Sequence, residues 1–86
     1  MTERTVAIAS KVGLHARPAM LFTQAVAETG AKVTIARPGE TPVDASSILS
    51  VMGLGMLHGE EVVLTTDDPD VLDALATLLS TDLDAR

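Results

Sequence analysis

The stretch GLHARPA, residues 13–19, decides how the first half of this chain folds. A short alternating apolar run precedes it, and apolar residues at helical spacing follow it, beginning with Ala19 and Phe22. The stretch is therefore predicted to turn from a strand into a helix, with His15 at or next to the helix start. Pro18 fits the first helical turn, because its fixed φ suits a helix and its missing N–H would have had no intrahelical partner.

His15 and Arg17 make this turn a candidate site for phosphate chemistry. The first turn of a helix presents N–H groups without intrahelical partners, and the helix dipole makes that end electropositive. A neutral imidazole, with an ordinary pKa of about 6.5, is a competent nucleophile at physiological pH. After attack on a phosphoryl group, the N–H groups of Ala16 and Arg17 and the Arg17 guanidinium would stabilise the added negative charge. A lone histidine near a helix start is more often a plain surface residue, but Gly13 before it and Arg17 after it favour the phosphoryl acceptor.

The composition limits the chain to one small domain without cysteine chemistry. Its 86 residues are too few for two cores, so a single domain over residues 1–86 is expected. The absence of cysteine excludes disulfides and thiolate metal sites. With no visible signal peptide and no apolar stretch near the ~20 residues that span a bilayer, a cytoplasmic protein without membrane insertion is expected. The net charge of −6 and the single aromatic residue argue against nucleic-acid binding.

The remaining pattern predicts the element order β-α-β-β-α-β-α. Strands are expected at Thr5–Ala9, Lys32–Ala36, Thr41–Val43 and Glu61–Thr66, and helices at Ala16–Thr29, Ser47–Met52 and from Asp68-Pro69 to about Leu83. Gly30 should end the first helix in a left-handed conformation, and Ser47 should cap the short helix. The expected core is Phe22, Val26, Leu72, Leu75 and Leu79. Short connections then favour an α+β fold, a four-stranded antiparallel sheet with the helices on one face and Glu61–Thr66 in its centre.

Two separated motifs resemble one known family. GLHARPA at residues 13–19 is similar to the active-site signature of HPr, the histidine-containing phosphocarrier family of the bacterial phosphoenolpyruvate:sugar phosphotransferase system, and SILSVMGLG at residues 47–55 is similar to that family's second segment. Length and element order match as well, so the resemblance covers essentially the whole chain. It implies an open-faced β-sandwich and a carrier rather than an enzyme, without a cofactor. His15 would accept a phosphoryl group on Nδ1 from phosphorylated enzyme I and pass it to the IIA units of sugar permeases, assisted by Arg17.

The resemblance also implies a docking surface and a regulatory serine. Partner proteins would dock on Met20, Ile48, Leu49 and Met52, whose adaptable apolar side chains suit several partners. The alternative, that Ile48 and Met52 only hold the short helix on the core, stays open, and Leu49 is expected to be the most exposed of the four. Ser47 aligns with the family's regulatory serine, which would bring in a serine kinase and phosphatase; its capping role alone also explains it.

Val12 departs from the family pattern, since it stands where the family usually has a small polar residue. The turn should therefore rely more on backbone N–H groups and Arg17. His58 is interpreted as a solvated loop residue, and no third ligand is spaced to make a metal site with His15. A monomer is expected. The alternative interpretations are a regulatory or nitrogen-branch HPr-like protein, and a small effector-binding sensor domain.

Overall fold

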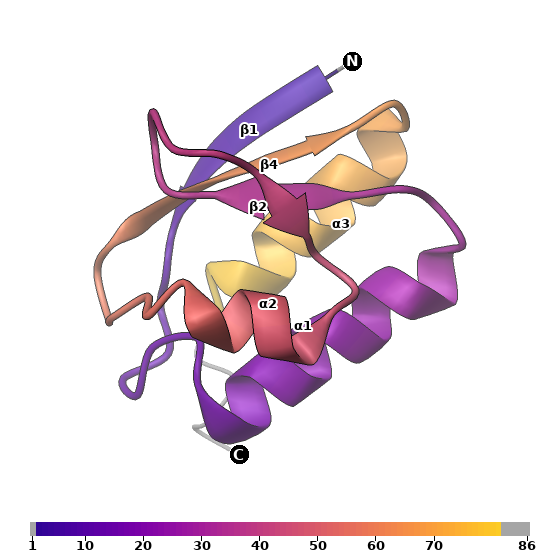
Figure 1. The fold of residues 1–86 in the computed structure, drawn as a ribbon. Helices are drawn as coiled ribbons and strands as arrows, with labels where there is room; N and C mark the ends of the chain where they lie inside the picture. The colour runs from indigo at the N-terminus through magenta and orange to yellow at the C-terminus, as the bar shows by residue number, and fades with distance from the viewer. Residues whose placement is uncertain (1, 82–86) are drawn as a thin grey trace.

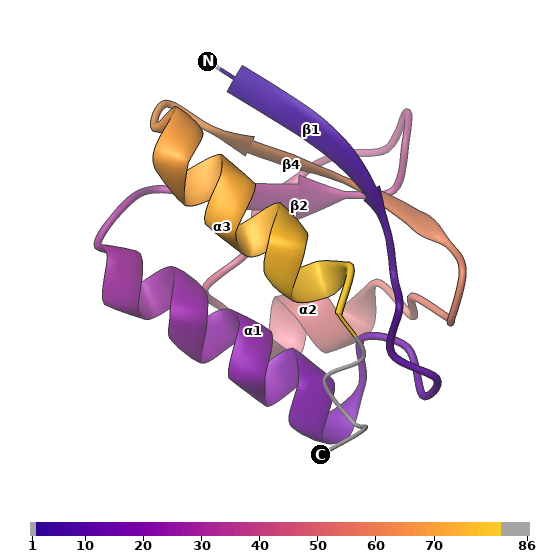
Figure 2. The same cartoon turned by 180° about the vertical axis from the view of Figure 1, so that it is seen from behind.

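A computed structural model describes residues 2–81 of the chain. Its elements are β1 (Thr2–Ala7), α1 (Ala16–Thr29), β2 (Thr34–Ala36), β3 (Val43–Asp44), α2 (Ile48–Gly53), β4 (Glu61–Thr66) and α3 (Pro69–Leu79). The strands form one antiparallel sheet in the order β1-β4-β2-β3. The helices lie on one side of this sheet, and α2 lies beside α1 near β3 (Figures 1 and 2). The predicted α+β open-faced sandwich is confirmed.

Strand β4 is the centre of the sheet, as the sequence predicted. It pairs with β1 along its whole length and with β2 on its other edge. Val62 and Leu64 are buried under the helices, whereas Val63 and Thr65, which point to the other face, are half-buried. This alternation follows from the two-residue period of a strand. The predicted bounds of β4 are also confirmed.

The other strands differ from their predicted bounds. Strand β1 begins at Thr2 instead of Thr5, because its exposed polar residues carry no apolar signal while their backbone still pairs with β4. Strand β2 begins at Thr34 instead of Lys32. The predicted return strand is displaced to β3, because Pro42 has no N–H to donate to a ladder and therefore precedes the strand.

The helix ends follow the predicted capping residues. Gly30 ends α1 with a φ of 69°, in the left-handed region. Ser47 caps α2, its Oγ accepting a hydrogen bond from the Ser50 N–H at 3.3 Å, so this helix begins one residue later than predicted. Asp68 caps α3, as expected. The predicted extension of that helix to Leu83 lies outside the described residues.

The core lies between the sheet and the helices. The predicted core is buried throughout: Phe22, Val26, Leu72, Leu75 and Leu79. Two further buried residues, which were not predicted, hold the segments around His15. Val51 anchors α2 and Leu14 anchors the turn before α1, with exposed fractions of 0% and 1%. Both lie in segments too short to show a periodic pattern.

Candidate functional site

The turn between β1 and α1 is held by its main chain. At its start, the Ile8 N–H donates to the Glu60 carbonyl at 2.9 Å, and the Ile8 carbonyl accepts from the Gly59 N–H at 2.8 Å. At its end, the Leu14 N–H donates to the Met56 carbonyl at 3.0 Å. Residues 8–14 are therefore fixed at both ends to residues 54–60, the supporting loop, which joins α2 to β4.

Gly13 permits the close contact between the turn and the supporting loop. Its φ is +74°, and a Cβ placed on it would lie 2.2 Å from the Met56 carbonyl oxygen. A side chain at this position would meet both a strained backbone and an overlap with main-chain atoms. The sequence indicated the sharp turn at Gly13, but the approach of Met56 comes from a segment more than forty residues away.

His15 points outward because its neighbour Leu14 points inward. The backbone at His15 is extended, with φ −140° and ψ 153°, so consecutive side chains lie on opposite sides of the chain. Leu14 is buried in the core, and His15 is exposed as the N-cap residue of α1, as predicted. The imidazole makes no side-chain capping hydrogen bond to the helix. The main chain at His15 is thus held in place, while the side chain faces solvent.

The first turn of α1 is favourable for an anion. It contains no acidic residue, and the exposed Arg17 lies in it. Pro18 and Ala19 are buried and hold the turn on the core. Ala16 has a φ of +51°, a left-handed conformation that costs a residue with a side chain roughly 1–2 kcal/mol. Nothing in the sequence signals this strain, because alanine does not mark a left-handed position as glycine does.

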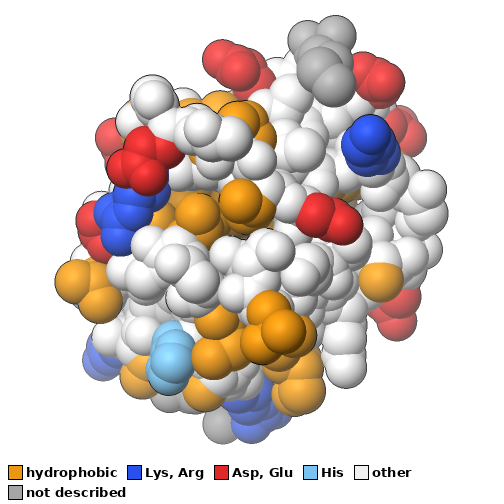
Figure 3. Space-filling model, in the orientation of Figure 1, with side chains coloured by type: hydrophobic (Ala, Val, Ile, Leu, Met, Phe, Trp, Pro, Cys, Tyr) orange, Lys and Arg blue, Asp and Glu red, His pale blue; other side chains and the backbone are white. Residues whose placement is uncertain are grey.

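The four predicted docking residues differ in exposure. Leu49 is the most exposed at 82%, as expected, and Met20 and Ile48 follow at 42% and 38%. Met52 is half-buried and packs against the core. Met52 therefore makes the core contact that the alternative describes, whereas Ile48 is exposed, and binding of partners by any of the four residues stays a prediction. Figure 3 shows hydrophobic side chains gathered over α2 on this face of the molecule.

Two further apolar side chains are exposed in the adjoining segments. Val12, in the turn before α1, and Leu57, in the supporting loop, have exposed fractions of 48% and 65%. Leu57 lies against the turn, since its Cα is 3.0 Å from where a Cβ on Gly13 would be. Leu57 was not among the predicted docking residues, because a single apolar residue in a glycine-rich loop gives no periodic signal.

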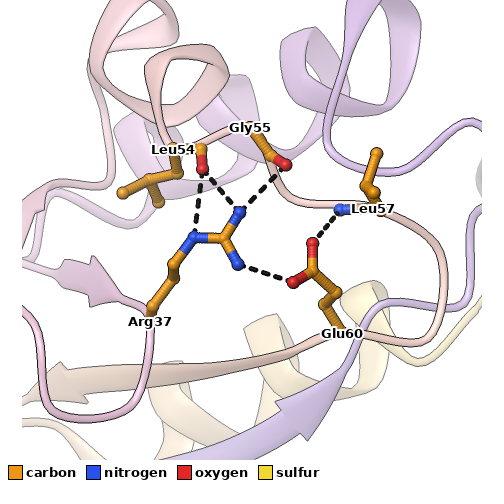
Figure 4. A network of polar contacts seen from close by, with 5 residues as sticks. All are labelled: Arg37, Leu54, Gly55, Leu57 and Glu60. Atoms are coloured by element: carbon orange, nitrogen blue, oxygen red, sulfur yellow. Dashed lines mark hydrogen bonds and ion pairs between the residues drawn. The ribbon is translucent and has the colours of Figure 1, made fainter.

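A polar network fixes the supporting loop (Figure 4). The Arg37 guanidinium donates from Nε and Nη2 to the Leu54 carbonyl at 3.2 and 2.9 Å, and from Nη2 to the Gly55 carbonyl at 3.0 Å. Its Nη1 pairs with Glu60 Oε2 at 2.6 Å, and Glu60 Oε1 accepts from the Leu57 N–H at 2.8 Å. The hydrogen bond from Arg37, followed by that from Leu57, lowers the pKa of the Glu60 carboxyl. Neither charged residue was predicted to have a role.

His58 is exposed in the supporting loop, in agreement with its interpretation as a loop residue. Among residues 2–81, no group of three or more histidine, aspartate or glutamate side chains is arranged to hold a metal ion. Within the same range, no helix has the length and apolar character needed to cross a bilayer.

The open-faced α+β sandwich with an exposed histidine at the start of its first helix is the arrangement expected of a small phosphocarrier domain. The family model described as "PTS HPr component phosphorylation site" matches residues 2–81. The chain belongs to the HPr family, the phosphocarrier proteins of the phosphotransferase system. Members of this family carry phosphoryl groups and are not catalytic enzymes.

Individual relatives agree with this assignment. The phosphocarrier protein HPr of Streptomyces coelicolor is 47% identical over 78 residues, which cover 91% of this chain and 84% of the relative. The HPr of Haloferax volcanii is 43% identical over 83 residues, covering 92% and 93%. The crystal structure of HPr-C-His from Thermoanaerobacter tengcongensis superposes with a TM-score of 0.88 at 32% identity, over 100% of this chain and 99% of that one.

Proposed function

We propose that His15 accepts a phosphoryl group from phosphorylated enzyme I and passes it to the IIA units of sugar permeases. The observation that carries this proposal is the exposed imidazole at the first turn of α1, on a backbone fixed by the buried Leu14. In the step proposed, the lone pair of the neutral ring, at Nδ1, attacks phosphorus. A bond from nitrogen to phosphorus forms as the bond from phosphorus to the donor group breaks, and the same exchange then runs to the acceptor.

The surroundings of His15 suit a carrier that must also release its phosphoryl group. The N–H groups of Ala16 and Arg17 and the Arg17 guanidinium are the groups proposed to stabilise the phosphorylated ring. The His15 ring is exposed and makes no capping hydrogen bond, so these groups would act without side chains that enclose the phosphate. Excess stabilisation of phosphorylated His15 would slow the second transfer, so a moderately stabilising site is the better carrier.

Partner proteins are proposed to dock on Met20, Ile48, Leu49 and Met52. Three of these side chains are exposed, and the fourth supports α2 from the core side. Apolar side chains of this kind fit different partners in turn without a fixed pattern of hydrogen bonds. Enzyme I and the IIA units would then use the same surface one after the other.

Ser47 is the proposed site of regulatory phosphorylation by a serine kinase, reversed by a phosphatase. Its Oγ lies at the N-terminus of α2, directly before two of the docking residues, Ile48 and Leu49. A phosphate there would add negative charge to an otherwise apolar docking surface and hinder transfer at His15. Ser47→Asp should therefore slow transfer, whereas Thr77→Asp, at an exposed position on α3, is the control for the added negative charge.

The remaining parts of the proposal concern the state of the protein. A cytoplasmic monomer with one domain over residues 1–86 and no cofactor suits a relay between soluble partners. The docking surface and the His15 turn lie on adjoining elements of one small unit, so no second domain is needed to complete the site.

The direct test is phosphorylation by enzyme I and phosphoenolpyruvate, followed by intact mass at neutral pH. The wild type should gain one acid-labile phosphate, His15→Ala none, and His58→Ala the full amount, which makes the second histidine the internal control. Arg17→Ala should be phosphorylated more slowly with an unchanged fold. Full labelling of His15→Ala would refute the assignment, and no gain by the wild type would favour a sensor.

A further inference from the structure

Arg37 connects the end of β2 to the supporting loop, which follows α2. Its side chain makes three hydrogen bonds to two consecutive carbonyl groups, those of Leu54 and Gly55. Its ion-pair partner Glu60 binds the N–H of Leu57 with its other carboxylate oxygen. Figure 4 shows that the pair holds Leu54, Gly55 and Leu57, which precede and follow Met56 in the sequence. Charge-assisted hydrogen bonds of this kind are stronger than neutral ones.

The clamped segment is also the one that supports the His15 turn. The Met56 carbonyl accepts from the Leu14 N–H at 3.0 Å, and the Met56 side chain is buried. The turn and the supporting loop are in close contact, since a Cβ on Gly13 would lie 2.2 Å from that carbonyl oxygen. A shift of the supporting loop would therefore be transmitted to Leu14 and to the imidazole of the next residue.

We propose that Arg37, held by Glu60, is a positioning residue for phosphoryl exchange at His15. The guanidinium does not act on the phosphate; it fixes the Met56 carbonyl, which fixes the Leu14 N–H and the backbone of His15. The effect on phosphoryl transfer rests on the proposed function. The effect on the position of the turn rests on the contacts alone. Small errors in position slow group transfer strongly, by up to about a hundredfold for roughly one ångström.

The experiment compares Arg37→Met with Arg4→Met as a matched control. Arg4 pairs with Asp73 on the exposed surface between β1 and α3, so the control removes the same charge and an ion pair without touching the supporting loop. Arg37→Lys and Glu60→Gln are milder variants that keep the test possible if Arg37→Met does not fold. Two quantities are measured for each: hydrogen exchange of the Leu14 amide by NMR, and the initial rate of phosphorylation by enzyme I.

Arg37→Met should speed Leu14 exchange by at least about tenfold, the factor expected for loss of one hydrogen bond to a charged group. Phosphoryl transfer should slow by at least about tenfold, with Arg37→Lys between this variant and the wild type. The control should change neither quantity. A Leu14 exchange rate in Arg37→Met equal to that of the control would overturn the proposal, as would an unchanged transfer rate in a phosphorylatable protein.

Failure of the proposed function is distinguishable from failure of this inference. If the wild type takes no phosphoryl group, the carrier assignment fails, and the exchange of the Leu14 amide still decides whether Arg37 holds the turn. A slower transfer in Arg37→Met with Leu14 exchange unchanged would also overturn the inference, because the effect would not run through the supporting loop. Recovery of both quantities in Arg37→Lys, relative to Arg37→Met, supports it.

Discussion

Gly13→Ala is the substitution for which the structure makes the sharpest prediction. The new methyl group would lie 2.2 Å from the Met56 carbonyl oxygen, where ordinary contact begins near 3.4 Å. The turn and the supporting loop would have to separate by about one ångström to relieve this overlap. That movement breaks the hydrogen bond from the Leu14 N–H to Met56, which is 3.0 Å long in the native protein.

The loss of stability has three contributions. A φ of +74° costs alanine about 1–2 kcal/mol, and the lost hydrogen bond about 1 kcal/mol. Forced overlap in a well-packed region adds about 1–3 kcal/mol. The total of roughly 4 kcal/mol is a large part of the 5–15 kcal/mol typical of small proteins, and at about 4–8 °C per kcal/mol it lowers Tm by roughly 15–30 °C.

The matched control is Gly30→Ala. Gly30 also has a left-handed φ, +69°, but a Cβ placed there has nothing within 4 Å. It should lose only the conformational cost of about 1–2 kcal/mol. Urea unfolding of both variants measures the difference, which isolates the contact with Met56. Equal losses of stability in the two variants would refute the reasoning, because the overlap would then have no cost. The Gly13 variant should in addition accept a phosphoryl group more slowly at a temperature where it is fully folded.

The remaining predictions concern a cap, a charge and a surface side chain. Asp68→Ala should lower the free energy of unfolding by about 1 kcal/mol in urea, since its carboxylate accepts the N–H groups at the start of α3. Glu60→Gln should destabilise the protein at neutral pH. Arg37 holds the pKa of the Glu60 carboxyl below its ordinary value of 4.5, so the ionised carboxylate stabilises the folded protein at any pH above 4.5. The difference from wild type, measured by urea unfolding, should disappear as the pH falls through the folded-state pKa of Glu60. Leu49→Asp should leave Tm unchanged but raise the KM of enzyme I for this protein by about tenfold or more. Thr77→Asp on α3 should leave that KM unchanged.

Local signals explain why much of the fold was predictable. Gly30, Ser47 and Asp68 each end or begin a helix through contacts within a few residues of themselves. The apolar run of β4 shows that it is buried, and its central place follows from that burial. The start of β1 was missed because an edge strand of exposed polar residues is defined by its partner's backbone and not by its own side chains.

The site was predictable only in part for a related reason. His15 and Arg17 stand in a dense local motif at a helix start, so their exposure followed from the pattern. The position of the Met56 carbonyl against Gly13 depends on how segments distant in the sequence pack together. The left-handed φ of Ala16 is not marked by its residue type either. The residue type at one position does not indicate a main-chain contact with a distant segment. A pattern interpreted one segment at a time therefore cannot predict such a contact.

These missed contacts would explain how an exposed ring could serve as the phosphoryl acceptor that we propose. An exposed side chain gains little precision from its surroundings, so its position depends on the backbone that carries it. Here Leu14 is fixed by the core on one side and by the Met56 carbonyl on the other, and the next residue, His15, has few ways to move its main chain. In the proposed function, the imidazole would then meet a partner in a defined place, without a cage of side chains that would have to open again. Precision supplied by the main chain is thus compatible with fast release, whereas the same precision supplied by groups bound to the phosphate would oppose it.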